Sequence, residues 1–248
     1  MMSGMHDLWS VGCFAGAGLF SILAKLGLGI SQIAIIHCII IFMIIFAFSR
    51  YFLPYKGASN GKAIAIPKGI VTLFGVLAVI SFLGEGGMMD WSGVFLTEAK
   101  GVDLSLAGVG YAVFSAAMLI GRLIGDKVVQ KLGEQRVVIF GGIVASVGYI
   151  ISIVFDNFFM MQFGFILLGF GAANIVPVVF TLLGRQKEMP INSAVTAVTS
   201  MGYLGVMFGP ALLGFIAHGI GIVAVFCILA GLFILQAIVS SYVFKVLN

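Results

Sequence analysis

The residues best suited to chemistry in this chain are two acids and a tryptophan in a strongly apolar stretch. Glu85, Asp90 and Trp91 lie within GEGGMMDWSGVFL, residues 84–96. A carboxyl group in an apolar helix is costly unless it faces a polar cavity or takes up a proton, and tryptophan offers a sugar ring an apolar stacking face. We therefore predict solute contact at all three, with proton coupling at Glu85. The alternatives are that Glu85 lies in water at the outer interface and that Trp91 belongs to the interfacial aromatic belt.

Glycines around this acid predict a local break in its helix. Gly84, Gly86 and Gly87 flank Glu85. A broken helix beside a midplane cavity exposes backbone groups to a solute, and a carboxyl group at such a cavity can bind and release a proton.

Four further hydrogen-bonding side chains lie within apolar stretches: Tyr111, Gln162, Asn174 and Gln236. Asn174 is the strongest candidate for solute contact, because it precedes a predicted kink at Pro177 by three residues. The alternative is that these groups only join helices, at about 1 kcal/mol each.

Metal, cofactor and enzyme chemistry are not predicted. Cys13, Cys38 and Cys227 lie within apolar stretches, without C-x-x-C spacing or a histidine cluster, and His37 is a lone histidine that is predicted to pack. The chain has no H-E-x-x-H, G-x-S-x-G or Walker motif. A membrane-embedded enzyme is therefore disfavoured, because acids, bases and metal ligands do not cluster on any pair of helices.

Membrane helices must position the candidate residues. With 61% apolar residues, 9% charged residues and a mean hydropathy of +1.21, a water-soluble fold would lack a polar surface. A hydrocarbon core about 30 Å thick needs roughly 20 apolar residues per helical crossing. The sequence predicts an all-α polytopic membrane protein with eight transmembrane helices, near residues 8–30, 33–53, 68–89, 104–125, 137–155, 158–183, 193–218 and 220–245.

The basic residues predict the orientation. If both termini are cytoplasmic in a bacterial inner membrane, only Lys25 and Lys100 of the 13 Lys and Arg residues lie outside. The net charge of +4 is then a product of topology and does not indicate a nucleic-acid partner. The inside residues are Arg50, Lys56, Lys62, Lys68, Arg122, Lys127, Lys131, Arg136, Arg185, Lys187 and Lys245.

The turn after the fourth span reads GRLIGDKVVQKLGEQR and contains a spaced motif of glycines and charges. Gly121 and Gly125 permit close helix approach, and Arg122 and Asp126 are spaced i,i+4 for an ion pair that could latch one bundle against another. An ordinary positive-inside loop is the alternative. With Gly133, these positions resemble the loop motif of the major facilitator superfamily, G-x-x-x-[DG]-[DR]-x-x-x-x-x-G.

Two later spans carry the same resemblance. GFGAANIVPVVFTLLGR, with Pro177, resembles the tenth helix of that family. GYLGVMFGPALLGFIAHG, with Gly205 and Gly209 ahead of Pro210, resembles the eleventh. Residues 84–96 look like the seventh helix of bacterial sugar-like and rhizopine-like facilitators, which are related more distantly to fucose permease.

Matched in this way, the eight spans correspond to the fifth to twelfth helices of the family. The resemblance implies a remnant of the N-terminal bundle at 1–53, a cytoplasmic linker at 54–67 and a complete six-helix C-terminal bundle at 68–248. It implies alternating-access secondary transport of a small polar, sugar-like solute with proton symport, in a lipid bilayer.

Because four helices of the family fold are missing, we expect the isolated chain to be inactive. It would need self-association or a separate N-terminal fragment to transport. The alternative function is a non-transporting membrane scaffold or remnant that acts as an interaction surface.

Overall fold

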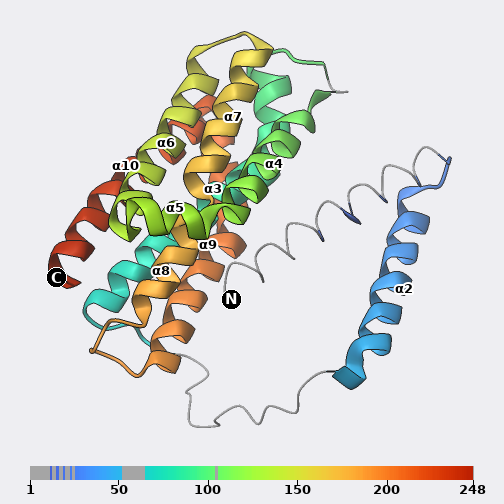
Figure 1. Ribbon diagram of the computed structural model, residues 1–248. Coiled ribbons are helices and arrows are strands. Elements are labelled where there is room, and N and C mark those ends of the chain that lie inside the picture. The colour runs from blue at the N-terminus through green and yellow to red at the C-terminus, as the bar shows by residue number, and fades with distance from the viewer. Residues whose placement is uncertain are drawn as a thin grey trace. The chain divides into compact units, whose positions relative to one another are not determined.

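The computed structural model describes residues 26–51, 65–103 and 106–247, together with five single positions between 12 and 23. The chain divides into two compact units, residues 1–60 and 61–248. The described residues form helices and no strand (Figure 1). Six of these helices are long and apolar enough to cross a membrane, and a seventh apolar helix is shorter. The prediction of an all-α polytopic membrane fold is therefore confirmed.

The first unit contains α2 (Ile30–Phe48), which continues into a short 3-10 turn, η1 (Ser49–Tyr51). This helix corresponds to the predicted span at 33–53, whereas the predicted span at 8–30 lies outside the described residues apart from the five single positions. The two ring nitrogens of His37 lie 2.9 Å and 3.2 Å from the carbonyl oxygens of Ile33 and Gly16. A neutral imidazole can donate to one of these carbonyl oxygens, which agrees with a packing role for His37.

The second unit contains the other eight α-helices that the structure describes. They are α3 (Ile70–Val94), α4 (Val109–Leu123), α5 (Gly125–Leu132), α6 (Glu134–Val154), α7 (Phe158–Ala172), α8 (Ile175–Leu183), α9 (Ile191–Ile220) and α10 (Ile222–Leu247).

Three features of this unit differ from the predicted spans. Helix α3 continues past residue 89 and ends in a π turn, η2 (Phe95–Ala99), because the exposed Asp90 does not interrupt a helix. The chain bends at Ile124, and the predicted loop forms α5, which runs across the long helices (Figure 1). The predicted span at 158–183 is divided into α7 and α8.

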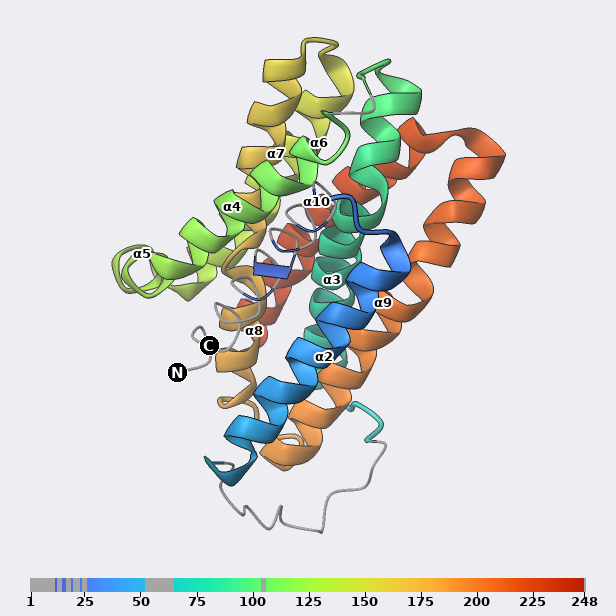
Figure 2. The same ribbon diagram turned by 90° about the vertical axis from the view of Figure 1, so that its right-hand side faces the viewer.

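Glycines allow the helices of this unit to approach closely. Helix α6 packs between α7 and α10, while α3 packs against α9 and α10 (Figures 1 and 2). A Cβ on Gly148 of α6 would lie 2.5 Å from the Gly164 carbonyl of α7, and a Cβ on Gly171 of α7 would lie 2.6 Å from the Gly141 carbonyl of α6. In lipid, association depends on this packing rather than on a hydrophobic driving force.

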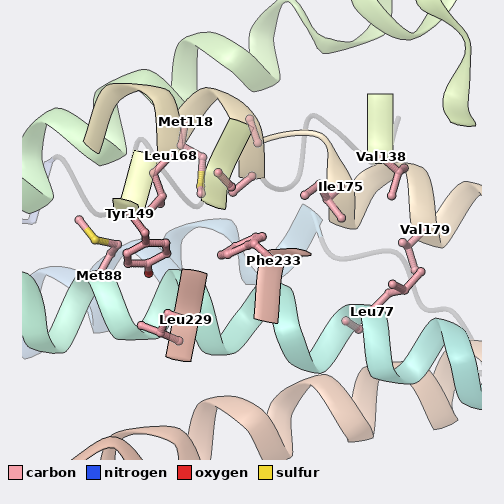
Figure 3. Packing of buried hydrophobic residues seen from close by; sticks show 14 of the residues in the cluster. Leu77, Met88, Met118, Val138, Tyr149, Leu168, Ile175, Val179, Leu229 and Phe233 are labelled. Atoms are coloured by element: carbon pink, nitrogen blue, oxygen red, sulfur yellow. The ribbon is translucent and has the colours of Figure 1, made fainter. Parts of the chain in front are cut away.

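Aromatic rings fill the centre of the unit around Tyr149 (Figure 3). The ring of Phe226 lies 4.0 Å from that of Phe95 and 5.4 Å from that of Tyr149, centroid to centroid. The Tyr149 hydroxyl donates to the Gly84 carbonyl at 3.1 Å, which satisfies a polar group that is fully buried. Helix α6 is thereby tied to α3 one residue before Glu85.

Side chains close the helix ends at one end of the unit. The Asn157 side chain caps α7 by accepting from Phe159 N and Met160 N at 2.9 Å and 3.2 Å. Lys100 Nζ donates to the Ile153 carbonyl in the last turn of α6 and to Asp156, both at 2.7 Å. A cation is favourable at this position because a helix C-terminus carries partial negative charge.

Candidate functional site

Glu85 lies near the middle of a long continuous helix. The apolar span that contains it runs from Ile70 to Ala99, 30 residues. At 1.5 Å rise per residue, Glu85 is about 22 Å from the start and about 21 Å from the end of this span. The structure thus places the acid at mid-span rather than at the end of a shorter helix.

The predicted helix break at the glycines is wrong. Helix α3 is continuous through Gly84, Gly86 and Gly87. Two of these glycines make room for α10, because a Cβ on Gly84 would lie 2.5 Å from the Phe233 ring and one on Gly87 would lie 2.6 Å from Leu229. A Cβ on Gly86 would meet nothing within 4 Å. The sequence GEGG therefore permits close packing and does not open the backbone.

Glu85 forms an ion pair with Arg122 of α4. Arg122 Nη2 lies 3.2 Å and 3.3 Å from the two carboxylate oxygens. The Arg122 side chain is 5% exposed and the Glu85 side chain 22% exposed. Unpaired charges are rarely tolerated at membrane depth, so each group supplies the other with a partner. Within the pair, the Glu85 carboxylate is the more exposed group.

Arg122 also contacts the α7–α8 break, through its Nε donor. Arg122 Nε lies 3.4 Å from the carbonyl oxygen of Ala173, in the break between α7 and α8. Pro177 explains why this carbonyl is available: proline has no N–H, and the acceptor four residues before it is Ala173. The buried Ala173 carbonyl therefore receives a guanidinium donor in place of the missing backbone donor.

Asn174, in the same α7–α8 break, donates a hydrogen bond back to α4. Its Nδ2 donates to the Gly121 carbonyl of α4 at 3.0 Å. Its Oδ1 lies where a Cβ on Gly125 would be, and a Cβ on Gly121 would lie 2.8 Å from Ala173 Cβ. The two motif glycines thus make room for the α7–α8 break.

The predicted ion pair between Arg122 and Asp126 is replaced by the pair with Glu85. Asp126 is exposed in the first turn of α5, and it makes no hydrogen bond or ion pair to the residues that the structure describes. The i,i+4 spacing fails because α4 ends at Leu123, so the two side chains belong to different helices. Gly133 joins α5 to α6 with φ +83°, a conformation that favours glycine.

Asp90 and Trp91 do not join this cluster through any observed interaction. Asp90 is exposed. The Trp91 ring is half-buried against α9, where a Cβ on Gly214 would lie 3.2 Å from it, and its Nε1 has no partner among the described residues. Trp91 therefore fills space between α3 and α9.

The remaining polar candidates lie on three separate helices. Tyr111 of α4 is half-buried, with its ring 6.2 Å from that of Phe114. Gln162 of α7 is 8% exposed and Gln236 of α10 is 0% exposed. Neither glutamine amide has a hydrogen-bond partner among the described residues. Only Asn174 of the four amide and hydroxyl candidates contacts the Arg122 region.

Pro210 does not interrupt α9, which is helical from Ile191 to Ile220. A Cβ on Gly205 would lie 3.3 Å from the Val79 carbonyl of α3, and one on Gly209 would lie 2.7 Å from Leu83. These glycines pack α9 against α3, which is the role that small residues have in membrane bundles.

A groove of about 380 Å³ between α6 and α10 lies away from the charged residues. It is lined by Ser146, Ile150, Ile153, Val154, Cys227, Ala230, Gly231 and Ile234. This lining is almost wholly apolar and includes neither member of the ion pair, so the groove does not extend the site.

The candidate site is therefore a node of three elements: Glu85 of α3, the end of α4, and the α7–α8 break. Sequence reasoning proposed these residues separately and missed their connection. It also missed Tyr149, for which a tyrosine within an apolar span was the available signal, because its hydroxyl needs a buried partner. Chemically, the node links the Glu85 carboxylate of α3 through Arg122 to the end of α4 and to the α7–α8 break.

Comparisons with known proteins agree with the arrangement of helices. The Major Facilitator Superfamily model matches residues 74–247. An uncharacterized MFS-type transporter of Yersinia pestis is 43% identical over 221 residues, which cover 88% of this chain and 57% of that protein. The uncharacterized transporter y4wD of Sinorhizobium fredii is 29% identical over 224 residues, 88% of this chain and 59% of that protein. The membrane protein MosC of Rhizobium meliloti is 30% identical over 150 residues, 60% of this chain and 37% of that protein. The chain thus spans little more than half the length of the first two relatives.

Proposed function

Because the chain belongs to the major facilitator superfamily, we propose that it forms part of a secondary transporter that moves a small polar, sugar-like solute by alternating access with proton symport. In this proposal residues 68–248 are the C-terminal bundle, residues 1–53 are two helices of the N-terminal bundle, and 54–67 is the linker. Alternating access needs two bundles that rock around a central site, with polar groups from both.

The observation that supports transport is the Glu85–Arg122 pair at mid-span. Ionisable residues at membrane depth are rare and mark solute or proton pathways. The buried Arg122 is satisfied from the protein side, whereas the Glu85 side chain keeps 22% exposure. In this proposal the proton reaches the carboxylate from this exposed side.

Proton binding at Glu85 gives a simple coupling step. The neutral carboxylic acid attracts Arg122 less strongly than the carboxylate does, so the pair weakens when the proton arrives and re-forms when it leaves. A solute hydroxyl that hydrogen-bonds to the carboxylate would compete for the same oxygens. Proton binding and solute binding would then be coupled, because both act on the Glu85–Arg122 ion pair.

The test is an uptake assay on a chimera in which this chain replaces the matching segment of the Yersinia relative. Cells that produce the chimera are given radiolabelled hexoses and inositols, with and without a proton gradient. We expect gradient-dependent uptake of at least one of them. The variant E85Q should lose the dependence on the gradient when uptake is divided by the amount of chimera in the membrane.

E134Q is the matched control, because Glu134 pairs with Arg185, whose side chain is 59% exposed, away from the proposed pathway. It should transport normally. Uptake that is unaffected by E85Q, in a chimera that transports, would refute proton coupling through Glu85. A chimera that reaches the membrane and moves none of these solutes would favour the scaffold function.

The isolated chain is expected to transport none of these solutes in liposomes, because it supplies one bundle and part of another. Restored uptake on adding the part of the Yersinia relative that this chain does not match would support a carrier assembled from two segments. Uptake by a purified monomer alone would contradict this expectation.

A further inference from the structure

At two helix breaks in this molecule, a side chain of each break donates a hydrogen bond to a backbone carbonyl of the other. The first lies between α7 and α8, where Pro177 leaves the Ala173 carbonyl without its usual donor. The second lies between α4 and α5, where Gly121 is in the last turn of α4, and carbonyl groups in a last turn commonly lack an intrahelical donor. Each break therefore leaves a carbonyl oxygen that needs a donor inside the bundle.

Each of these carbonyls receives a side-chain donor from the other break. Arg122 Nε of the α4 end lies 3.4 Å from Ala173 O, and Asn174 Nδ2 of the α7–α8 break lies 3.0 Å from Gly121 O. At each break the residue that accepts a bond is followed directly by the residue that donates one: Gly121 by Arg122, and Ala173 by Asn174. Separation of the two breaks would expose both carbonyls at once.

The contact surface is shaped for this exchange. A Cβ on Gly121 would press on Ala173 Cβ at 2.8 Å, and a Cβ on Gly125 would overlap the Asn174 amide. Two of the motif glycines thus permit the approach of the two breaks, and Glu85 of α3 holds the remaining edge of the Arg122 guanidinium.

We propose that Arg122 and Asn174 are positioning residues that make the α4–α5 and α7–α8 breaks bend together as one hinge. The role of this hinge in a solute-moving cycle rests on the proposed function, whereas the coupling of the two breaks does not. Asn174 is thereby assigned to the hinge and not to solute contact. A change of charge at Glu85 would reach both breaks through Arg122.

The test measures both breaks in the full chain, in lipid nanodiscs and without solute. Spin labels are attached at Phe163 and Thr181 across the α7–α8 break, and in a second sample at Ala112 and Gln130 across the α4–α5 break. These positions are exposed. Cys13, Cys38 and Cys227 are replaced by serine, and the label separations are measured by pulsed dipolar spectroscopy.

The first variant is N174D, which keeps the shape of the side chain and removes the Nδ2 donor. We expect a new distance population at both label pairs, including the α4–α5 pair, which lies on other helices. The matched control is N157A, which removes the asparagine cap from the opposite end of α7. It should leave both distributions unchanged.

P177A provides an independent perturbation if N174D does not fold, because alanine restores the N–H that competes with Arg122 for Ala173 O. It should straighten the α7–α8 break, which changes the distance between the labels at Phe163 and Thr181. It should also shift the distance between the labels at Ala112 and Gln130. A change confined to the α7–α8 pair, with the α4–α5 pair unmoved, would overturn the coupling for either variant. That result would leave the transport proposal untouched, because no solute is involved.

Discussion

The Glu85–Arg122 pair makes a quantitative prediction about the stability of the bundle. Arg122 Nη2 lies 3.2 Å from the nearer carboxylate oxygen. At an effective dielectric constant of about 20, Coulomb attraction at this separation is about 5 kcal/mol. Because Glu85 is 22% exposed and the contact is longer than a strong charge-assisted bond, we take roughly half, about 2–3 kcal/mol, as the coupling that an experiment would measure.

A double-mutant cycle tests this value. E85Q, R122Q and the double variant are unfolded in mixed micelles with increasing SDS, and the free energies of unfolding are compared. Each single variant removes one charge of the pair and leaves the opposite charge without this contact, so each should lose about 3 kcal/mol. The double variant should lose less than the sum by about 2–3 kcal/mol, because no unpaired charge remains.

The matched control is the second Arg–Glu pair, Arg185 with Glu134. Its contact is shorter, 2.8 Å, but the Arg185 side chain is 59% exposed. The cycle with R185Q and E134Q should give a coupling of about 0–1 kcal/mol, because water screens the pair. If the Glu85–Arg122 cycle is additive within about 0.5 kcal/mol, the reasoning about that pair fails.

Three further outcomes follow from the packing and are measured in the same SDS unfolding assay, and a fourth follows from the distribution of basic residues. G125A should unfold at much lower SDS than the parent chain, because its Cβ would overlap the Asn174 amide. G86A should be neutral or gain up to about 1 kcal/mol of stability, because its new methyl group meets open space in a helix. Equal effects of the two variants would refute the packing argument. Y149F should cost about 1 kcal/mol through the lost hydroxyl bond, and an unchanged stability would show that this bond contributes nothing net. Q236L should be neutral or stabilising, since it removes a buried amide that has no partner among the described residues, and a loss of stability would reveal a partner for that amide. A green fluorescent protein fused after Asn248 should fluoresce, as it does when it folds in the cytoplasm, and a dark fusion with an active periplasmic reporter would reverse the predicted topology.

The family and the helical architecture could be predicted because they depend on local sequence. Apolar runs of the right length predict membrane helices, and each predicted span between residues 68 and 245 overlaps at least one helix. Boundaries were less accurate where a charge interrupts an apolar run. Asp90 ended the predicted helix, yet α3 continues because an exposed acid fits on the surface of a helix.

The connections within the site could not be predicted, because they join residues far apart in sequence. Pro177 predicted a break nearby, but it did not predict that Arg122, 51 residues before Ala173, supplies the missing donor. The glycines beside Glu85 were misread for a similar reason. A missing Cβ permits either a bend or a close neighbour, and only the position of α10 decides between them.

The unequal lengths of α3 and α4 bear on how this bundle meets its lipids. The apolar span Ile70–Ala99 has 30 residues, about 45 Å, whereas α4 has 15 residues, about 22 Å. Against a hydrocarbon layer of about 30 Å, the first is too long and the second too short, so α3 must tilt and the layer must thin around α4. Lys127 and Lys131 of α5 are exposed, and lysine side chains are long enough to extend towards lipid headgroups. Hydrophobic mismatch thus makes acyl-chain length a physical variable for this protein, with shorter-tailed lipids favouring the bent end of α4.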